Sequence, residues 1–106
     1  MPPSKPFLSS NKTVSECPKC LVAVRGEPLE SYVTCKAPDA TRVNIKVGEK
    51  NAPVHMFKPG GFRPIYTVTD EDHMVIVTCE VGNDDYDIVK KINKTLYVAG
   101  TISLIV

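Results

Sequence analysis

Four cysteines constrain this chain more than any other feature of its sequence. Two lie close together in the motif Cys17-Pro18-Lys19-Cys20, and the isolated Cys35 and Cys79 each follow an apolar, β-branched run. An even number of cysteines in a small chain is typical of a disulfide framework. We therefore expect two disulfide bonds.

Two sequons for N-linked glycosylation, at Asn11 and Asn93, favour the same oxidising environment. We expect a secreted or cell-surface glycoprotein that carries sugar at these two asparagines. The first residues contain no apolar signal segment, so this expectation requires that Met1 is not the natural start or that a signal peptide was removed. If Met1 is the natural start, a cytosolic protein is expected instead.

Length and charge exclude several classes of protein. A chain of 106 residues fits one domain, and its 13 Lys and Arg nearly balance its 12 Asp and Glu, so no basic surface for nucleic acid is predicted. No apolar run approaches the roughly 20 residues that a membrane span needs. Residues 1–16, rich in Pro, Ser and Lys, are interpreted as a flexible arm, and residues 17–106 as a single folded domain.

Short β-branched segments alternate with turn residues from Cys17 onward, which predicts an all-β, antiparallel β-sandwich. The longest segment, residues 73–81, is expected to be a central strand, and Pro64 restricts residues 64–68 to an edge strand. Residues 93–94 are interpreted as a tight connection between two strands. The strands are expected at residues 21–25, 31–36, 41–47, 54–57, 64–68, 73–81, 86–92 and 96–99, and residues 101–106 end the chain in an apolar run.

The cysteines admit three interpretations. Cys35 and Cys79 lie on the apolar faces of their strands, so we favour a bridge between them, which leaves Cys17 to pair with Cys20. Alternatively, Cys17 and Cys20 form half of a zinc site, although neither His55 nor His73 has ligand spacing to them. A redox pair would need a helix after the motif, and an extended run follows it instead.

The sequence from Val77 to Val81 around Cys79 resembles the second cysteine strand of immunoglobulin domains, and its distance from Cys35 suits their inter-sheet bridge. This resemblance implies a sandwich that is immunoglobulin-like in outline. The chain departs from the family pattern because it has no Trp, and because Val77 stands where a Tyr is expected.

Residues 17–100 also resemble the six-cysteine extracellular domain of nematodes, a family without an assigned function. The matching motifs are the Cys-Pro-x-Cys at Cys17, the Val-Thr-Cys at Cys35 and the Val-Thr-Cys at Cys79. Two of that family's six cysteines are missing here, near Ser31 and near Gly100. The resemblance implies that one of Cys17 and Cys20 pairs with Cys35 and the other with Cys79.

Candidate site residues are few. The segment 57–63 combines Phe57, Lys58, Phe62 and Arg63 with two glycines, which is typical of a recognition loop, although a plain hairpin loop is the favoured interpretation. His55 is interpreted as structural, and Asp72-His73 as an orienter and base without a nucleophile motif. Asn83, Asp84, Asp85 and Asp87 have oxygen ligands at loop spacing, but a solvated acidic turn is the favoured interpretation.

We therefore predict a non-catalytic extracellular binding or adhesion module, stabilised by two disulfides, with no cofactor and no metal. Its expected partner is an extracellular protein or a glycan, bound through Phe57, Lys58, Phe62 and Arg63. A small zinc-binding protein organised by Cys17 and Cys20 is the alternative.

Overall fold

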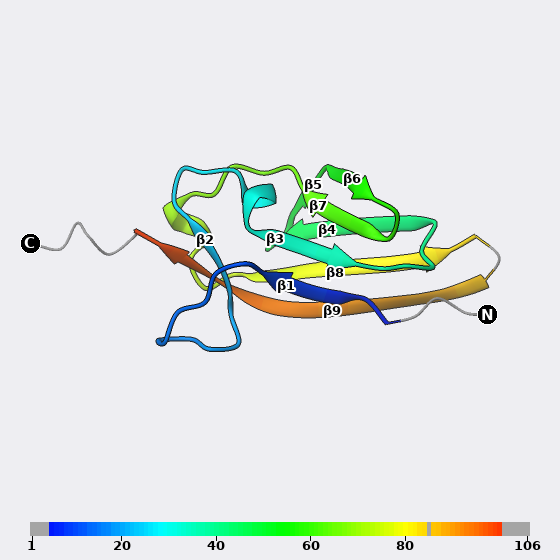
Figure 1. Cartoon of the computed structure of the whole chain (residues 1–106), viewed down its shortest axis with the longest axis horizontal. Helices are drawn as coiled ribbons and strands as arrows, with labels where there is room; N and C mark the ends of the chain where they lie inside the picture. The colour runs from blue at the N-terminus through cyan, green and yellow to red at the C-terminus, as the bar shows by residue number, and fades with distance from the viewer. Residues whose placement is uncertain (1–4, 85, 101–106) are drawn as a thin grey trace, which may run out of the picture.

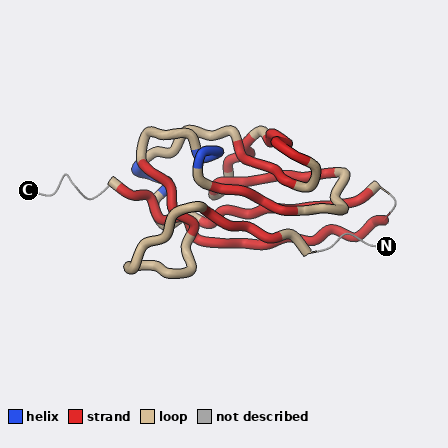
Figure 2. Tube along the Cα trace, viewed as in Figure 1, coloured by secondary structure: helices blue, strands red, loops and turns tan. Residues whose placement is uncertain are grey.

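The computed structural model describes residues 5–84 and 86–100, and these residues fold into a β-sandwich of two packed sheets (Figure 1). Apart from two short 3₁₀ turns, Leu29–Ser31 and Asp70–Asp72, the described residues form strands and loops (Figure 2). The strands are β1 (Phe7–Ser10), β2 (Leu21–Val24), β3 (Val33–Lys36), β4 (Arg42–Val47), β5 (Lys50–Ala52), β6 (Val54–Lys58), β7 (Gly61–Pro64), β8 (Ile76–Asn83) and β9 (Tyr86–Ala99).

One sheet has four strands in the order β1-β3-β7-β6, and the other has five in the order β2-β9-β8-β4-β5. All neighbours pair antiparallel except β2, which pairs parallel with β9. An immunoglobulin domain packs a four-stranded sheet against a sheet built on three neighbouring strands. Here the four strands β1-β3-β7-β6 pack against a sheet in which β9, β8 and β4 are neighbours, which reproduces that strand order. The predicted immunoglobulin-like outline is confirmed.

Strand alternation places one row of apolar side chains from each sheet in the core. In β3, Val33 and Cys35 are fully buried, whereas Thr34 and Lys36 point outward. In β4, Ile45 and Val47 are buried while Lys46 between them is exposed. Burial of such rows from two facing sheets is the main stabilising contribution in a sandwich.

A disulfide joins Cys35 of β3 to Cys79 of β8 and so links the two sheets across the core, with the Cα atoms 6.5 Å apart. The second disulfide joins Cys17 to Cys20 in the loop between β1 and β2. The pairing favoured from the inward faces of Cys35 and Cys79 is confirmed. The pairing implied by the nematode resemblance, in which Cys17 and Cys20 bond to Cys35 and Cys79, is not the one present.

Two features of the immunoglobulin core are replaced by other residues. Ile45, and not a Trp, lies directly opposite Cys79 in the β4–β8 ladder. Val77, two residues before Cys79, is fully buried. The turn before β8 is held by Asp72. Its carboxylate accepts hydrogen bonds from the Tyr66 hydroxyl at 2.8 Å and from the Thr69 amide at 2.8 Å.

The N-terminal segment is the first place where the structure differs from the prediction. Residues 7–10 are not part of a flexible arm, because β1 pairs with β3 and the Leu8 side chain is fully buried. The Ser10 hydroxyl also accepts a hydrogen bond from the Val22 amide at 3.0 Å, which ties β1 to the start of β2. A four-residue strand with one inward apolar residue has no periodicity to detect, so only its pairing reveals it.

Two other strand predictions are wrong in their boundaries. The predicted edge strand at residues 64–68 is replaced by β7, which ends at Pro64 and lies between β3 and β6. Residues 93–94 do not form a connection, because β9 continues through them opposite Thr78 and Val77. Proline ends the β7 ladder because it has no amide proton, and the polar residues 93 and 94 do not interrupt β9 because their backbone pairs with β8. The apolar run at residues 101–106 lies outside the described residues.

Candidate binding site

A polar depression of about 260 Å³ lies on the outer face of the four-stranded sheet. Thr34 and Lys36 reach it from β3 because they alternate with the buried Val33 and Cys35, and Ser9 of β1 pairs directly with Thr34. Strands β6 and β7 and the segment before β3 complete its wall. Its lining consists of Ser9, Ser10, Asn11, Glu30, Ser31, Tyr32, Thr34, Lys36, Phe57, Lys58 and Arg63.

Phe57 and Arg63 form a stacked pair at this site. The guanidinium carbon of Arg63 lies 3.9 Å from the centre of the Phe57 ring, and the Lys58 ammonium lies 5.5 Å from the same centre. Contacts between a cation and an aromatic face contribute about 0.5–2 kcal/mol, depending on desolvation. The stack therefore holds the arginine in one orientation.

Glycine at positions 60 and 61 makes this arrangement possible. A Cβ atom on Gly61 would come within 2.8 Å of the Phe57 ring, so only glycine lets the ring lie against β7. Gly60 has a φ of 76° and approaches Pro38 so closely that a Cβ atom would lie 2.9 Å from the Pro38 Cα atom. The turn between β6 and β7 thus needs both glycines, for conformation and for space.

Three cations of the depression form no ion pair among the described residues. The ion pairs of the described residues are Arg25 with Asp70 and Arg42 with Asp84, and neither involves Lys36, Lys58 or Arg63. The Nε atom of Arg63 is buried and has no hydrogen-bond partner within the described part of the chain. Unmatched cations in a hollow attract anions more strongly than the same charges in ion pairs.

At the rim, Tyr32 donates a hydrogen bond from its hydroxyl to the Glu27 carboxylate. That bond raises the pKa of Tyr32 above its usual value, and desolvation and the Glu27 charge act in the same direction. The tyrosine hydroxyl is therefore held by the protein itself.

The structure brings together three of the four predicted binding residues. Phe57, Lys58 and Arg63 line the depression, but Phe62 does not. Phe62 lies opposite Cys35 in the β3–β7 ladder and packs against the core. The segment 57–63 is a hairpin, as the favoured interpretation predicts, and strand alternation turns Phe62 inward.

Sequence reasoning missed the contribution of β1 and β3. Lys36 and Thr34 are predictably outward from their alternation with Val33 and Cys35, but no sequence signal places them beside Arg63. That proximity arises from the pairing of β3 with β7, in which Lys36 lies opposite Gly61.

Both predicted glycosylation sites are exposed in the structure. The Asn11 side-chain amide donates a hydrogen bond to the Ser31 carbonyl at 3.0 Å, at the edge of the depression. Asn93 lies on β9, exposed on the five-stranded sheet, and its side-chain oxygen accepts a hydrogen bond from the Thr78 hydroxyl at 2.8 Å. It lines two hollows of about 330 and 160 Å³ there. Glycosylation at either position stays a prediction.

The histidine and carboxylate candidates have structural surroundings. His73 accepts a hydrogen bond at Nδ1 from the Val98 amide at 3.1 Å and contacts the Tyr97 ring edge-on. The hydrogen bonds of the Asp72 carboxylate come from Tyr66 and Thr69 and not from His73, so the orienter-and-base arrangement is absent from this pair. His55 is exposed on β6, opposite Arg63 in the ladder.

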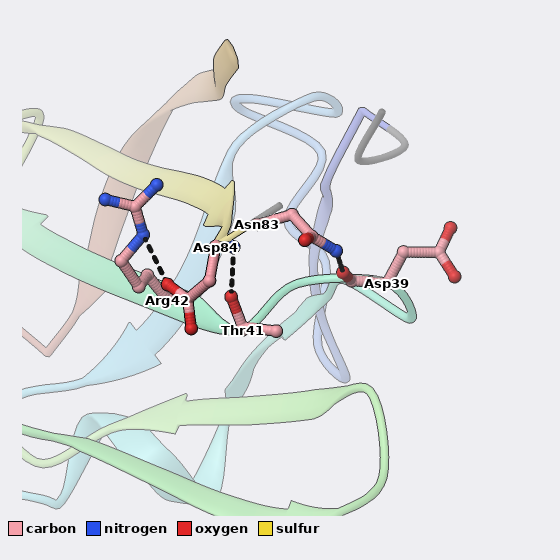
Figure 3. A network of polar contacts seen from close by, with 5 residues as sticks. All are labelled: Asp39, Thr41, Arg42, Asn83 and Asp84. Atoms are coloured by element: carbon pink, nitrogen blue, oxygen red, sulfur yellow. Dashed lines mark hydrogen bonds and ion pairs between the residues drawn. The ribbon is translucent and has the colours of Figure 1, made fainter. Parts of the chain in front are cut away.

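The acidic turn after β8 is engaged in contacts with the segment that leads into β4 (Figure 3). The Asp84 carboxylate lies 3.3 Å from Nε of Arg42, and the Asp84 amide donates to the Thr41 hydroxyl at 2.7 Å. The Asn83 side chain donates to the Asp39 carbonyl at 2.7 Å. Asp85 lies outside the described residues. Asp84 and Asn83 therefore close the end of the sandwich and do not converge on a common point.

The disulfide between Cys17 and Cys20 overturns the zinc alternative, because neither sulfur is a free thiolate. Within residues 5–84 and 86–100, no group of three or more His, Cys, Asp or Glu side chains is placed to hold a metal ion. A scan against protein-family models and a search of curated proteins found no match to this chain. Membership of the nematode six-cysteine family stays a prediction.

Proposed function

We propose that this protein is a non-catalytic extracellular binding module whose contact surface is the outer face of the four-stranded sheet. The observation that carries the proposal is the convergence of Lys36, Lys58 and Arg63 in one depression, where none of the three forms an ion pair among the described residues. A hollow with a few convergent polar groups is the usual form of a recognition site. The stacked Phe57 gives the site a rigid aromatic element.

An extracellular location is supported by the two disulfides and by the sequons at Asn11 and Asn93. In the described part of the chain there is no helix with the length and apolar character needed to cross a membrane.

Binding is proposed and not catalysis because of the chemistry of the lining. The described lining residues supply hydroxyls, amides, two lysines, an arginine and a glutamate, and include no histidine or cysteine. Hydroxyls and cations of this kind recognise ligands, whereas acid–base catalysis near neutral pH usually needs a group that titrates there.

The proposal is tested by comparing two double variants of the purified protein. Lys58→Ala with Arg63→Ala removes two cations from the depression, and Lys46→Ala with Lys91→Ala removes two from the other sheet. Each protein is joined into tetramers, and the binding of these tetramers to a panel of extracellular-matrix fractions and cell surfaces is measured. We expect binding of the parent and of the Lys46/Lys91 variant, and loss of binding in the Lys58/Arg63 variant with little change in melting temperature.

Equal binding by both variants, or loss only in the Lys46/Lys91 variant, would remove the four-stranded sheet from the proposed site. Phe62→Ala is unsuitable for this experiment because the side chain packs against the core, so its loss would lower stability.

A further inference from the structure

We infer that the ligand of the depression is an anionic oligosaccharide, with sulfate or carboxylate groups on a chain of sugar hydroxyls. The ligand class rests on the proposed function and adds to it the chemistry of the partner. Three features of the site carry it: unmatched positive charge, the kinds of polar groups available, and the fixed position of Arg63.

Charge is the first feature. Lys36, Lys58 and Arg63 come from three different strands, β3, β6 and β7, and surround one hollow that contains a single carboxylate side chain, Glu30. Glu30 forms no ion pair with any of the three within the described residues. The site therefore carries a local excess of positive charge, although the whole chain has a net charge of only +1. An anionic group is the complementary ligand.

The second feature is that the middle of the site presents side chains and no free strand edge. Both β3 and β7 have a neighbour on each side, so their backbone amides and carbonyls are used within the sheet. A peptide that binds by adding a strand needs an open edge, and the open edges of this sheet belong to β1 and β6, not to the strands that carry Lys36 and Arg63. The groups available are the hydroxyls of Ser9, Ser31 and Thr34, which both donate and accept hydrogen bonds, as sugar hydroxyls do.

The third feature is the geometry of Arg63. Its guanidinium carbon lies 3.9 Å from the centre of the Phe57 ring, and this contact restricts the side chain of Arg63. A planar guanidinium binds a sulfate or carboxylate through two parallel hydrogen bonds, and less entropy is lost when the arginine side chain is already restricted. Lys36 and Lys58 supply point charges on either side.

The size of the hollow favours one unit of a longer chain over a small enclosed ligand. Its volume of about 260 Å³ is slightly below the roughly 300–1,000 Å³ of small-molecule pockets. One sugar unit of a longer chain would contact Lys36 and Lys58 within the hollow, and its neighbouring units would extend over the rim. We expect weak binding that decreases with salt, since the contacts are charged and exposed to solvent.

The test is an NMR titration of the isotope-labelled, disulfide-bonded protein with a fully sulfated heparin-derived hexasaccharide, in which the backbone amide shifts are measured. The protein is prepared without N-glycans because Asn11 lines the hollow. Three probes of matched length and concentration accompany it: an uncharged hexasaccharide that has been desulfated, N-acetylated and carboxyl-reduced, a hyaluronan oligosaccharide that carries carboxylates alone, and a polyglutamate peptide. We expect saturable shifts centred on residues 9, 34, 36, 58 and 63 with the sulfated or the carboxylated sugar, and no binding of the uncharged one.

Matched variants test the site itself. Arg63→Gln and the double variant Lys36→Gln with Lys58→Gln should each weaken binding at least tenfold, and Arg63→Lys, which keeps the charge but loses the fork, should lie between parent and Arg63→Gln. Lys46→Gln with Lys91→Gln, which removes the same charge from the other sheet, should change affinity less than twofold.

Three results would overturn the inference: equal loss in the Lys46/Lys91 variant, tighter or equal binding of polyglutamate, or no saturable binding of either anionic sugar. If neither anionic sugar binds while capture on the matrix panel still depends on Lys58 and Arg63, the ligand class is wrong and the binding module stands. If capture is independent of these residues as well, both proposals fail.

Discussion

The outer faces of the two sheets arrange their charged residues differently. On the five-stranded sheet, Glu80 of β8 lies opposite Lys91 of β9, and Arg42 at the end of β4 lies 3.3 Å from the Asp84 carboxylate. We call this outer surface the balanced face. On the four-stranded sheet, which we call the cationic face, Lys36, Lys58 and Arg63 have no carboxylate within ion-pair distance among the described residues.

The difference shows that the near-neutral net charge of the chain is not distributed evenly. Opposite charges on neighbouring strands stabilise a sheet modestly, so the Glu80–Lys91 register pair and the Arg42–Asp84 ion pair of the balanced face serve the fold. The charges of the cationic face give no such stabilisation and are available to a ligand. Local pairing, and not total charge, distinguishes the two faces.

The comparison depends on the strand register that sends alternate residues inward and outward, and Ile45→Asp tests that register with the largest expected effect. Ile45 is 1 % exposed and lies opposite Cys79 and Ala52, so aspartate would bury an unpaired charge. We expect loss of more than about 4 kcal/mol of the free energy of unfolding, measured by urea denaturation. The adjacent outward change Lys46→Ala should cost less than about 0.5 kcal/mol. A folded Ile45→Asp protein would show that the register of β4 is wrong.

Removing each disulfide in turn separates the stabilisation by the inter-sheet bridge from the stabilisation by the bridge within the loop between β1 and β2. Cys35 and Cys79 are 44 residues apart in sequence, and Cys17 and Cys20 are 3 apart. Loop entropy predicts losses of about 4 kcal/mol for Cys35→Ala with Cys79→Ala and about 2 kcal/mol for Cys17→Ala with Cys20→Ala. Chemical denaturation of both double variants gives the two values. Equal losses would contradict the view that the inter-sheet bridge is the dominant covalent constraint.

Asp72 holds the turn that precedes β8 and so fixes where the balanced face begins. Asp72→Ala would leave the Tyr66 hydroxyl and the Thr69 amide without their acceptor. We expect a loss of about 1–3 kcal/mol in thermal or urea unfolding. Asp72→Asn keeps an acceptor oxygen and should lose less; a larger loss than in Asp72→Ala would show that the hydrogen bonds are not the cause.

Stability should also fall above pH 10 through Tyr66. Burial raises the pKa of Tyr66 above its ordinary value of 10.0, as do the hydrogen bond to Asp72 and its charge, whereas Lys50 lowers it. Because its pKa is raised, the Tyr66 hydroxyl keeps its proton up to a higher pH in the folded state than in the unfolded state. This contribution is therefore complete below pH 10 and is lost as the pH rises through the pKa of the folded state. Melting temperatures between pH 9 and 11 should fall less steeply in Tyr66→Phe than in the parent.

Charge reversal on each face gives the smallest effect and tests the comparison most directly. Glu80→Lys places like charges opposite each other on the balanced face and should destabilise by about 0.2–1 kcal/mol. Lys36→Glu, on the cationic face, should leave stability unchanged or raise it by a few tenths of a kcal/mol. Both effects should shrink in 1 M salt, where charges are screened within about 3 Å. A cost for Lys36→Glu as large as for Glu80→Lys would mean that the two faces do not differ.

Much of the fold follows from the sequence because strand alternation is a local property. The inward positions of Cys35, Ile45 and Val47 follow from the polar residues between them, and so does the preference for a bridge between Cys35 and Cys79. The same reasoning failed for residues 7–10 and 93–94. There, a short strand and a polar strand segment exist because a partner strand supplies their hydrogen bonds.

The sequence by itself determined an all-β chain with two disulfides, and which side chains of most strands face the core. The tertiary structure decided which strands became neighbours, and hence that Lys36 lies beside the Phe57–Arg63 pair while Phe62 turns inward. The reason is physical: a side chain's inward or outward direction depends on residues one or two positions away. The neighbours of an outward side chain depend on pairing between strands that lie 20 or more residues apart.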